Sequence, residues 1–295
     1  MESIDLIATS TFGLERVVAR ELQQLGITDA ETRDSKILFK GTPLDVCRTN
    51  LWLRSADRVL IHMASFEAKD FDTLFESTKA LPWEKWLTLD AKFPVTGKSV
   101  RSVLHSTPHC QSIVKKAIVE RLKKHYQRHW FDETGPEYKV DVHIMKDQVV
   151  LSIETSGPGL HKRGYREKHG TASLKETLAA GLLQLSVWKP GRPFWDPFCG
   201  SGTLPIEAAM IGCHIAPGMQ RSFTAEDWPQ LPPALWSEAR TEARDLRKRA
   251  LPVPAVGSDS DRQMIKISEK NAQRAGVAGS VQFHTVPFED VELDA

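Results

Sequence analysis

A strand end, a glycine turn and a helix start follow one another within Asp196-Pro197-Phe198-Cys199-Gly200-Ser201-Gly202-Thr203. Glycines lack a Cβ atom, so they let the backbone turn sharply and let a ligand approach the main chain. The first N–H groups of the following helix have no acceptor inside that helix and can donate hydrogen bonds to a ligand. The stretch therefore predicts a site for a nucleotide-like molecule. We expect this ligand to contact Asp196, Pro197, Cys199, Gly200, Ser201, Gly202 and Thr203.

The elements around this turn can be predicted from the neighbouring residues. The short apolar run 193–195 is typical of a buried parallel strand, and 204–211 is typical of a helix with Pro205 in its first turn. A dinucleotide fingerprint would need a glycine where Pro205 stands, and a phosphate loop would need a lysine after Gly202. The turn instead looks like motif I of class I S-adenosylmethionine-dependent methyltransferases, whose glycines lie under the amino acid and ribose of the cofactor.

A second acidic residue supports a cofactor site. Residues 255–259 are predicted to form another short strand, which ends at Asp259. An acidic side chain at the end of the second strand can accept hydrogen bonds from both ribose hydroxyls. We therefore expect Asp259 to bind the cofactor.

The helix after this second strand has clear ends in the sequence. Ser260 and Gln263 form a possible capping box for a helix over 262–275, which Gly276 would close. Asp261 is interpreted as a helix N-terminal residue stabilised by the macrodipole, in preference to a cofactor ligand.

Long connections surround the predicted site. Residues 212–236 are rich in Gly, Pro and Trp and indicate an irregular insertion, whereas 237–250 predict a charged helix that is interpreted as solvated rather than bound to nucleic acid. Upstream, Ser173 and Glu176 form an S-x-x-E capping box for a helix that ends near 189–191.

Several ordered motifs resemble the bacterial ribosomal RNA large subunit methyltransferase L family. They are Gly159-Leu160-His161-Lys162-Arg163-Gly164-Tyr165-Arg166, Leu174-Lys175-Glu176-Thr177-Leu178-Ala179-Ala180, the Asp196–Thr203 turn with Ile206-Glu207-Ala208-Ala209, Ala216-Pro217-Gly218 and Gly257-Ser258-Asp259-Ser260-Asp261.

This resemblance implies a guanine-N2 methyltransferase that acts on 23S ribosomal RNA, with S-adenosylmethionine as its cofactor. It implies an N-terminal RNA-binding region over 1–160, with a ferredoxin-like part and a THUMP domain at about 45–155. Residues 161–295 would form a partial Rossmann-like methyltransferase domain, so the fold class is α+β followed by α/β. In methyltransferases of exocyclic amines, the helix before the first strand often lines the cofactor site, which makes Lys175 and Thr177 further cofactor candidates.

Positive charge is concentrated in the segment 98–130, which has eight Lys or Arg residues and one acidic residue. It predicts a helix capped by Ser112, with cations on one side. Such a concentration can attract RNA phosphates, although a solvated helix face would look the same. The methyltransferase resemblance favours RNA, and the predicted contacts are Lys115, Lys116 and Lys123.

The segment after the predicted domain junction is also basic. It includes Arg163 and Arg166 beside Tyr165. We expect an RNA clamp there, with interdomain packing as the alternative.

The remaining composition is that of an ordinary soluble protein of 295 residues with net charge +1. The four cysteines form no C-x-x-C pair or zinc pattern, so we expect no metal site and a reducing cytoplasm. No stretch approaches the ~20 apolar residues of a membrane span, and we expect no membrane partner.

The sequence departs from the family pattern in two ways. It contains no Asn-Pro-Pro-Tyr or Asp-Pro-Pro-Tyr, the motif that holds the target amine, and no fourth strand can be predicted after 281–286. We therefore expect a truncated, inactive chain without catalytic residues. Near the adenine, Pro287 stands where the family tends to have an acidic residue, which leaves Phe288 and Asp290 as alternatives.

Two other functions remain open from the sequence. A DNA adenine-N6 methyltransferase would share the cofactor half. A non-catalytic RNA-binding protein would share the N-terminal region.

Overall fold

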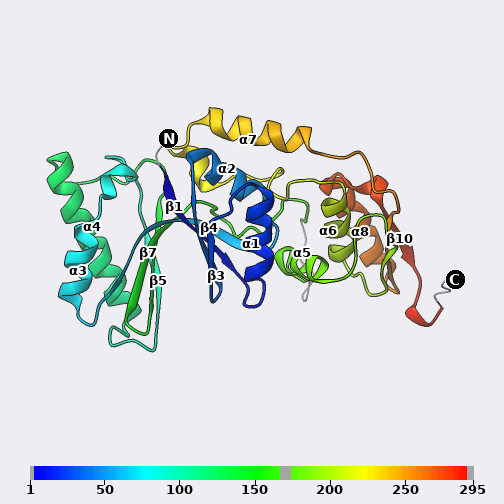
Figure 1. Cartoon of the computed structure of the whole chain (residues 1–295), viewed down its shortest axis with the longest axis horizontal. Coiled ribbons are helices and arrows are strands. Elements are labelled where there is room, and N and C mark those ends of the chain that lie inside the picture. Colours follow the sequence, from blue (N-terminus) through cyan, green and yellow to red (C-terminus); the bar gives the residue numbers. More distant parts are fainter. Residues whose placement is uncertain (1–2, 167–173, 291–295) are drawn as a thin grey trace.

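The computed structural model describes residues 3–166 and 174–290. Figure 1 shows an elongated molecule in which the two sheets lie toward opposite ends of the long axis. Among the described residues, none of the helices combines the length and the apolar character needed to cross a bilayer.

The N-terminal sheet has seven strands in the order β2-β3-β1-β4-β7-β6-β5. They are β1 (Ile4–Ser10), β2 (Ala30–Arg33), β3 (Lys36–Gly41), β4 (Ala56–Glu67), β5 (Val95–Val100), β6 (Lys139–Met145) and β7 (Gln148–Glu154). Strand β4 pairs with β1 from Ala56 to Ile61 and with β7 from Leu60 to Glu67. The regions predicted to be ferredoxin-like and THUMP therefore share one continuous sheet, and β4 is the strand that belongs to both.

Helices cover this sheet. They are α1 (Glu15–Gln24), α2 (Pro43–Trp52), α3 (Phe71–Lys79), the short η1 (Trp83–Lys85) and α4 (Thr107–Tyr126). Helix α4 begins six residues earlier than predicted, after Ser106, with Pro108 in its first turn. Ser112 lies exposed inside the helix. Its assignment as the cap was wrong because proline is well tolerated in a first turn and marks the start more strongly.

The second sheet is parallel, with the order β10-β9-β8. Its elements are α5 (Glu176–Leu185), β8 (Phe194–Asp196), α6 (Thr203–Gly212), β9 (Ala255–Asp259), α8 (Arg262–Ala275), η3 (Ala278–Ser280), β10 (Val281–Thr285) and η4 (Phe288–Asp290). The predicted bounds of β9 and α8 are confirmed, and Gly276 closes α8 with φ +71°. Parallel pairing brings the carboxyl ends of β8 and β9 to one edge of the sheet.

Two predicted caps in this half need comment. Asp261, not Ser260, caps α8, because its Oδ1 accepts the N–H of Gln263 at 2.7 Å. Ser173, the predicted cap of α5, lies outside the described residues.

The insertion between α6 and β9 returns to the N-terminal sheet. We call residues 216–246 the return segment; it contains η2 (Thr224–Asp227) and α7 (Pro233–Asp245). Helix α7 packs on α2, and the buried Trp228 and Trp236 belong to the same core as the seven-stranded sheet. Trp228 stacks on Tyr138 with ring centroids 4.5 Å apart. Figure 1 shows α7 lying along α2.

The return segment corrects two expectations. The predicted charged helix begins at Pro233 and ends at Asp245, and it is amphipathic rather than wholly solvated. Its Glu242 accepts two hydrogen bonds from Arg48 of α2, at 2.8 and 2.9 Å. The predicted boundary at 160/161 therefore does not separate the two hydrophobic cores, because the return segment lies after it in the chain and packs in the N-terminal core.

Candidate cofactor site and its link to the N-terminal region

The glycine turn lies between β8 and α6, as predicted. Gly200 and Gly202 have φ of +50° and +81°, which glycine adopts readily. A Cβ atom on Gly202 would come within 2.9 Å of the Phe283 ring and 3.0 Å of the Ser268 Cβ. A Cβ atom on Gly200 would meet no heavy atom within 4 Å. Gly202 is thus needed for packing, whereas Gly200 has open space into which a ligand can come.

Asp259 holds this turn from the end of β9. Its Oδ2 accepts the N–H of Gly200 at 3.0 Å, and its Oδ1 accepts the N–H of Asp261 at 2.9 Å. Each carboxylate oxygen can accept more than one hydrogen bond, so both keep capacity for a ligand hydroxyl. Asp259 therefore links the second strand to the glycine turn that precedes α6.

Two polar side chains of α8 hold the glycine turn by hydrogen bonds to its carbonyl groups. Ser268 Oγ donates to the carbonyl of Gly200 at 2.7 Å, and Asn271 Nδ2 donates to that of Ser201 at 3.0 Å. Both side chains are buried. Sequence reasoning missed them, although two polar residues three apart on the apolar side of an amphipathic helix were a usable signal.

The electrostatics of the turn are set mainly by burial. Desolvation raises the pKa of Asp196, and the nearby charge of Asp259 raises it further. The hydrogen bond that Asp196 accepts from the Phe198 N–H acts in the opposite direction and lowers this pKa. Burial also raises the pKa of the Cys199 thiol to about 12, and Asp196 and Asp259 contribute in the same direction. Cys199 is therefore protonated at neutral pH and serves to pack the turn.

Three aromatic side chains gather beside the carboxyl ends of the strands. Phe288 stacks on Trp195 with centroids 6.2 Å apart, and Phe198 lies 5.2 Å from Phe288. Phe198 is 71% exposed and Phe288 is 50% exposed. Open aromatic faces next to a carboxylate and a glycine turn fit a ligand with a flat base and a ribose. Asp290 is also exposed, in η4.

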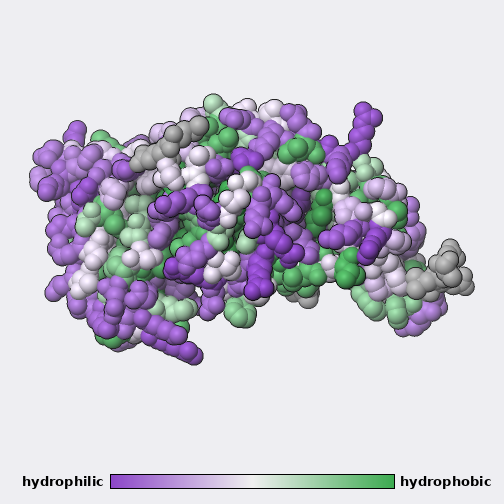
Figure 2. Space-filling view, viewed as in Figure 1, coloured by the Kyte–Doolittle hydropathy of each residue, from purple (hydrophilic) through white to green (hydrophobic). Residues whose placement is uncertain are grey.

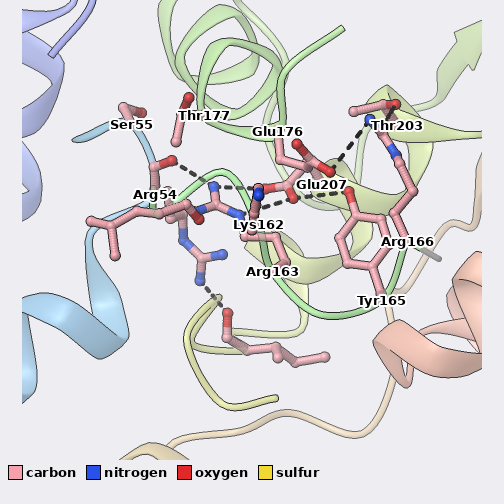
Figure 3. A network of polar contacts seen from close by, with 12 residues as sticks. Arg54, Ser55, Lys162, Arg163, Tyr165, Arg166, Glu176, Thr177, Thr203 and Glu207 are labelled. Atoms are coloured by element: carbon pink, nitrogen blue, oxygen red, sulfur yellow. Dashed lines mark hydrogen bonds and ion pairs between the residues drawn. The ribbon is translucent and has the colours of Figure 1, made fainter. Parts of the chain in front are cut away.

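A buried polar network lies on the other side of α6 (Figure 3). Arg163 is 2% exposed and pairs with Glu207 of α6 at 3.4 Å. Tyr165, which is 1% exposed, donates its hydroxyl to the same carboxylate at 3.2 Å. Arg163 also donates to the carbonyl of Arg54, between α2 and β4, at 2.5 Å. The network thus joins the N-terminal region to the helix that follows the glycine turn.

A second part of the network reaches the turn itself. Arg166 pairs with Glu176 at the start of α5 at 3.4 Å and donates to Oγ1 of Thr203, the first residue of α6. Both charged side chains are only 5% exposed. Burial raises the pKa of Glu176, and the charge of Arg166 opposes that rise.

These contacts correct three predicted site residues. Arg163 and Arg166 do not present their guanidinium groups to RNA, because both are buried and bound within the protein, so the packing alternative holds for this loop. Thr177 is 1% exposed and its hydroxyl donates to Asp57 at 3.4 Å, so its side chain is enclosed and bound within the protein. Lys175 is exposed before α5 and remains a candidate.

Helix α4 carries the predicted basic residues in different environments. Lys115 binds Glu133 at 2.6 Å and the carbonyl of Phe93 at 3.0 Å. Lys123 pairs with Glu120 at 2.9 Å, whereas Lys116 is exposed. Among the residues that the structure describes, no group of three or more His, Cys, Asp or Glu side chains could hold a metal ion.

Three domain families match successive parts of the chain. A ferredoxin-like domain described as that of RlmL matches residues 5–60, the THUMP domain matches 68–154, and the RMKL-like methyltransferase domain matches 163–295.

Two curated relatives match over 98% of this chain. The protein from Bacillus subtilis named "Putative RNA methyltransferase YpsC" is 49% identical, and the chain covers 76% of it. The "Ribosomal RNA large subunit methyltransferase K/L" of Syntrophotalea carbinolica is 35% identical, with 42% of its length covered.

Solved structures share the whole fold. A Listeria monocytogenes protein described as "a predicted N6-adenine-specific DNA methylase" superimposes with a TM-score of 0.96 at 49% identity, with all of this chain and 77% of that one covered. Another, "SMU.472, a putative methyltransferase complexed with SAH", has a TM-score of 0.93 at 41% identity, and the superposition covers all of this chain and 78% of its own.

Proposed function

The chain belongs to the family of THUMP-containing, RMKL-like RNA methyltransferases, and we propose that it methylates guanine N2 of 23S ribosomal RNA. The methyl donor is S-adenosylmethionine, whose demethylated product SAH is bound in a 41% identical structure. The observation that carries the proposal is the attachment of a THUMP-containing sheet, through the buried Arg163–Glu207 network, to a glycine turn held by Asp259.

We assign the cofactor contacts by the geometry of the turn. Asp259 would accept hydrogen bonds from the ribose hydroxyls, and the open backbone at Gly200 would lie under the ribose and amino acid. The exposed ring of Phe288 suits the adenine better than Asp290, because it already stacks in line with Trp195. When bound, the sulfonium supplies an electrophilic methyl group, and these residues hold it in a fixed direction for in-line attack.

The Asp259 assignment can be tested by cofactor binding. Asp259→Asn should weaken S-adenosylmethionine binding by ~10–100-fold, because hydrogen bonds to a charged group are worth about 1.5–3 kcal/mol. Calorimetry with an analogue that lacks both ribose hydroxyls separates ribose binding from damage to the turn. The variant should bind this analogue about as well as the parent chain does, and an equal loss for both ligands would refute the ribose role. Asp261→Asn, at the exposed cap of α8, is the matched control.

The target base is tested in cells. Deletion of the gene should remove one N2-methylguanosine from 23S ribosomal RNA, as measured by mass spectrometry of nuclease digests. Loss of N6-methyladenine from DNA with unchanged ribosomal RNA would favour the DNA alternative. The THUMP domain and the RNA methyltransferase relatives favour RNA. The four buried, unpaired cysteines fit the reducing cytosol in which ribosomes assemble.

A further inference from the structure

The segment after α4 carries an exposed tryptophan at the THUMP end of the molecule. Trp130 is 79% exposed. An indole contributes a large apolar surface when it finds a partner, and tryptophan is enriched at binding surfaces for this reason. Figure 1 places α4 at the end of the long axis opposite α8 and β10.

The backbone around Trp130 is fixed on both sides. Its neighbour Phe131 is partly buried and packs on Tyr126, with ring centroids 6.4 Å apart. Tyr126 is anchored in turn by a hydrogen bond from its hydroxyl to the carbonyl of Leu87 at 2.7 Å. On the other side, Glu133 pairs with Lys115 at 2.6 Å. Trp130 therefore projects outward from a segment that the fold holds in place.

The indole ring is oriented as well. Its Nε1 donates to Oδ1 of Asp132 at 3.1 Å. This bond satisfies the only donor of the side chain and leaves the faces of the ring open. Because the ring is already oriented, a flat ligand that stacks on it meets a smaller loss of conformational entropy.

Two cations precede Trp130 in the chain, Lys124 in the last turn of α4 and Arg128 just after the helix. Lys124 and Arg128 are exposed, and neither forms an ion pair with another residue in 3–166 or 174–290. Of the acidic groups nearby, Glu120 is paired with Lys123 and Glu133 with Lys115, while Asp132 accepts the indole N–H of Trp130. Figure 2 shows hydrophilic residues over most of this end of the molecule.

We propose that Trp130 is a stacking platform for an unpaired base of the substrate RNA, with Lys124 and Arg128 contacting the neighbouring phosphates. Aromatic faces with cations beside them suit single-stranded RNA, whose bases can leave their stack. This inference rests on the proposed RNA substrate. It adds that the RNA must present an unpaired nucleotide far from the methylated base, because α4 and the glycine turn lie toward opposite ends of the molecule.

The test measures binding of a fluorescein-labelled, single-stranded RNA of about 12 nucleotides, a length within the range of single-strand sites. Trp130→Ala should weaken binding by roughly tenfold, which is within the range for loss of one stacked base. Trp130→Phe should stay within about threefold, because it keeps a stacking face. Phe12→Ala removes an equally exposed aromatic at 77% from the ferredoxin-like part and should change nothing.

The outcomes separate the inference from the function on which it rests. If the parent chain binds the RNA and Trp130→Ala binds it equally well, the platform is wrong while the RNA substrate stands. If the parent chain binds neither this RNA nor 23S ribosomal RNA, the proposed function fails and the platform fails with it. Competition for the labelled RNA by an acidic peptide at equal affinity, lost in Trp130→Ala, would instead identify a protein partner and overturn the inference.

Discussion

Two basic segments of similar sequence character have opposite environments in this molecule. The loop that contains Arg163 and Arg166 directs both side chains into the interior, where each guanidinium is paired to a carboxylate. Helix α4 and the segment after it leave Lys116, Lys124 and Arg128 exposed. The difference teaches that a cluster of cations is open to a ligand only where acidic partners are absent or already engaged. In the loop, Glu207 pairs with Arg163 and Glu176 pairs with Arg166, so neither guanidinium is open to a ligand.

The largest effect on stability is expected in the buried loop. Arg163→Met leaves Glu207, which is fully buried, without its counter-charge. Removal of one partner of a buried pair costs about 3–5 kcal/mol. Urea unfolding followed by circular dichroism should show this loss, and the double variant with Glu207→Gln should recover a large part of it. A stable Arg163→Met chain with tenfold weaker RNA binding would contradict this comparison, because Arg163 would then act in RNA binding and not in stability.

An intermediate effect on stability is expected at Lys115, which belongs to α4 but makes its contacts within the protein. Its Nζ lies 3.5 Å from the Phe93 ring centroid and binds Glu133. Lys115→Met should lower the free energy of unfolding by about 1 kcal/mol, the scale of one hydrogen bond with a cation–π contact. RNA affinity should change by less than about twofold. Lys116→Met is the exposed control. A Lys115→Met variant that loses RNA affinity and not stability would place this residue on the RNA surface.

The smallest effect on stability is expected at Lys124 and Arg128. Each substitution to glutamine should change stability by less than about 0.5 kcal/mol, because surface charges without partners contribute little. RNA affinity should fall, and the slope of its dependence on salt should decrease by about one for each phosphate that the variant no longer binds. Titrations at several salt concentrations measure that slope. An unchanged slope in both variants would show that this surface is merely solvated.

The cofactor half was the more predictable part of the chain. Glycines that need positive φ, a carboxylate at a strand end and a glycine that closes a helix are local features, so Gly200, Gly202, Asp259 and Gly276 could be placed from sequence alone. The Ser260 cap failed for a local reason as well. Asp261 stands one residue later and competes for the same amides.

The failures in the loop and in the return segment have a different cause. Sequence reveals that Arg163 is basic but not that Glu207, 44 residues later, meets it in the interior. In the same way, the tryptophans of 212–236 indicated an irregular insertion, while Tyr138, on which Trp228 stacks, lies far earlier in the chain. Long-range partners determine burial, and burial determined which predicted site residues were wrong.

The return segment also bears on how the polypeptide is made. Residues 3–154 leave the ribosome before α7 and can form their sheet, yet the surface of α2 that α7 covers stays open until α7 has been synthesised. Domains generally fold as units in the order of synthesis. Here the N-terminal unit acts as a template on which a later stretch of the methyltransferase half docks, so a slowly translated chain would expose that apolar surface for longer. The N-terminal core can therefore be completed once α7 has been made, whereas the second sheet must wait for β9 and β10, which follow α7 in the chain.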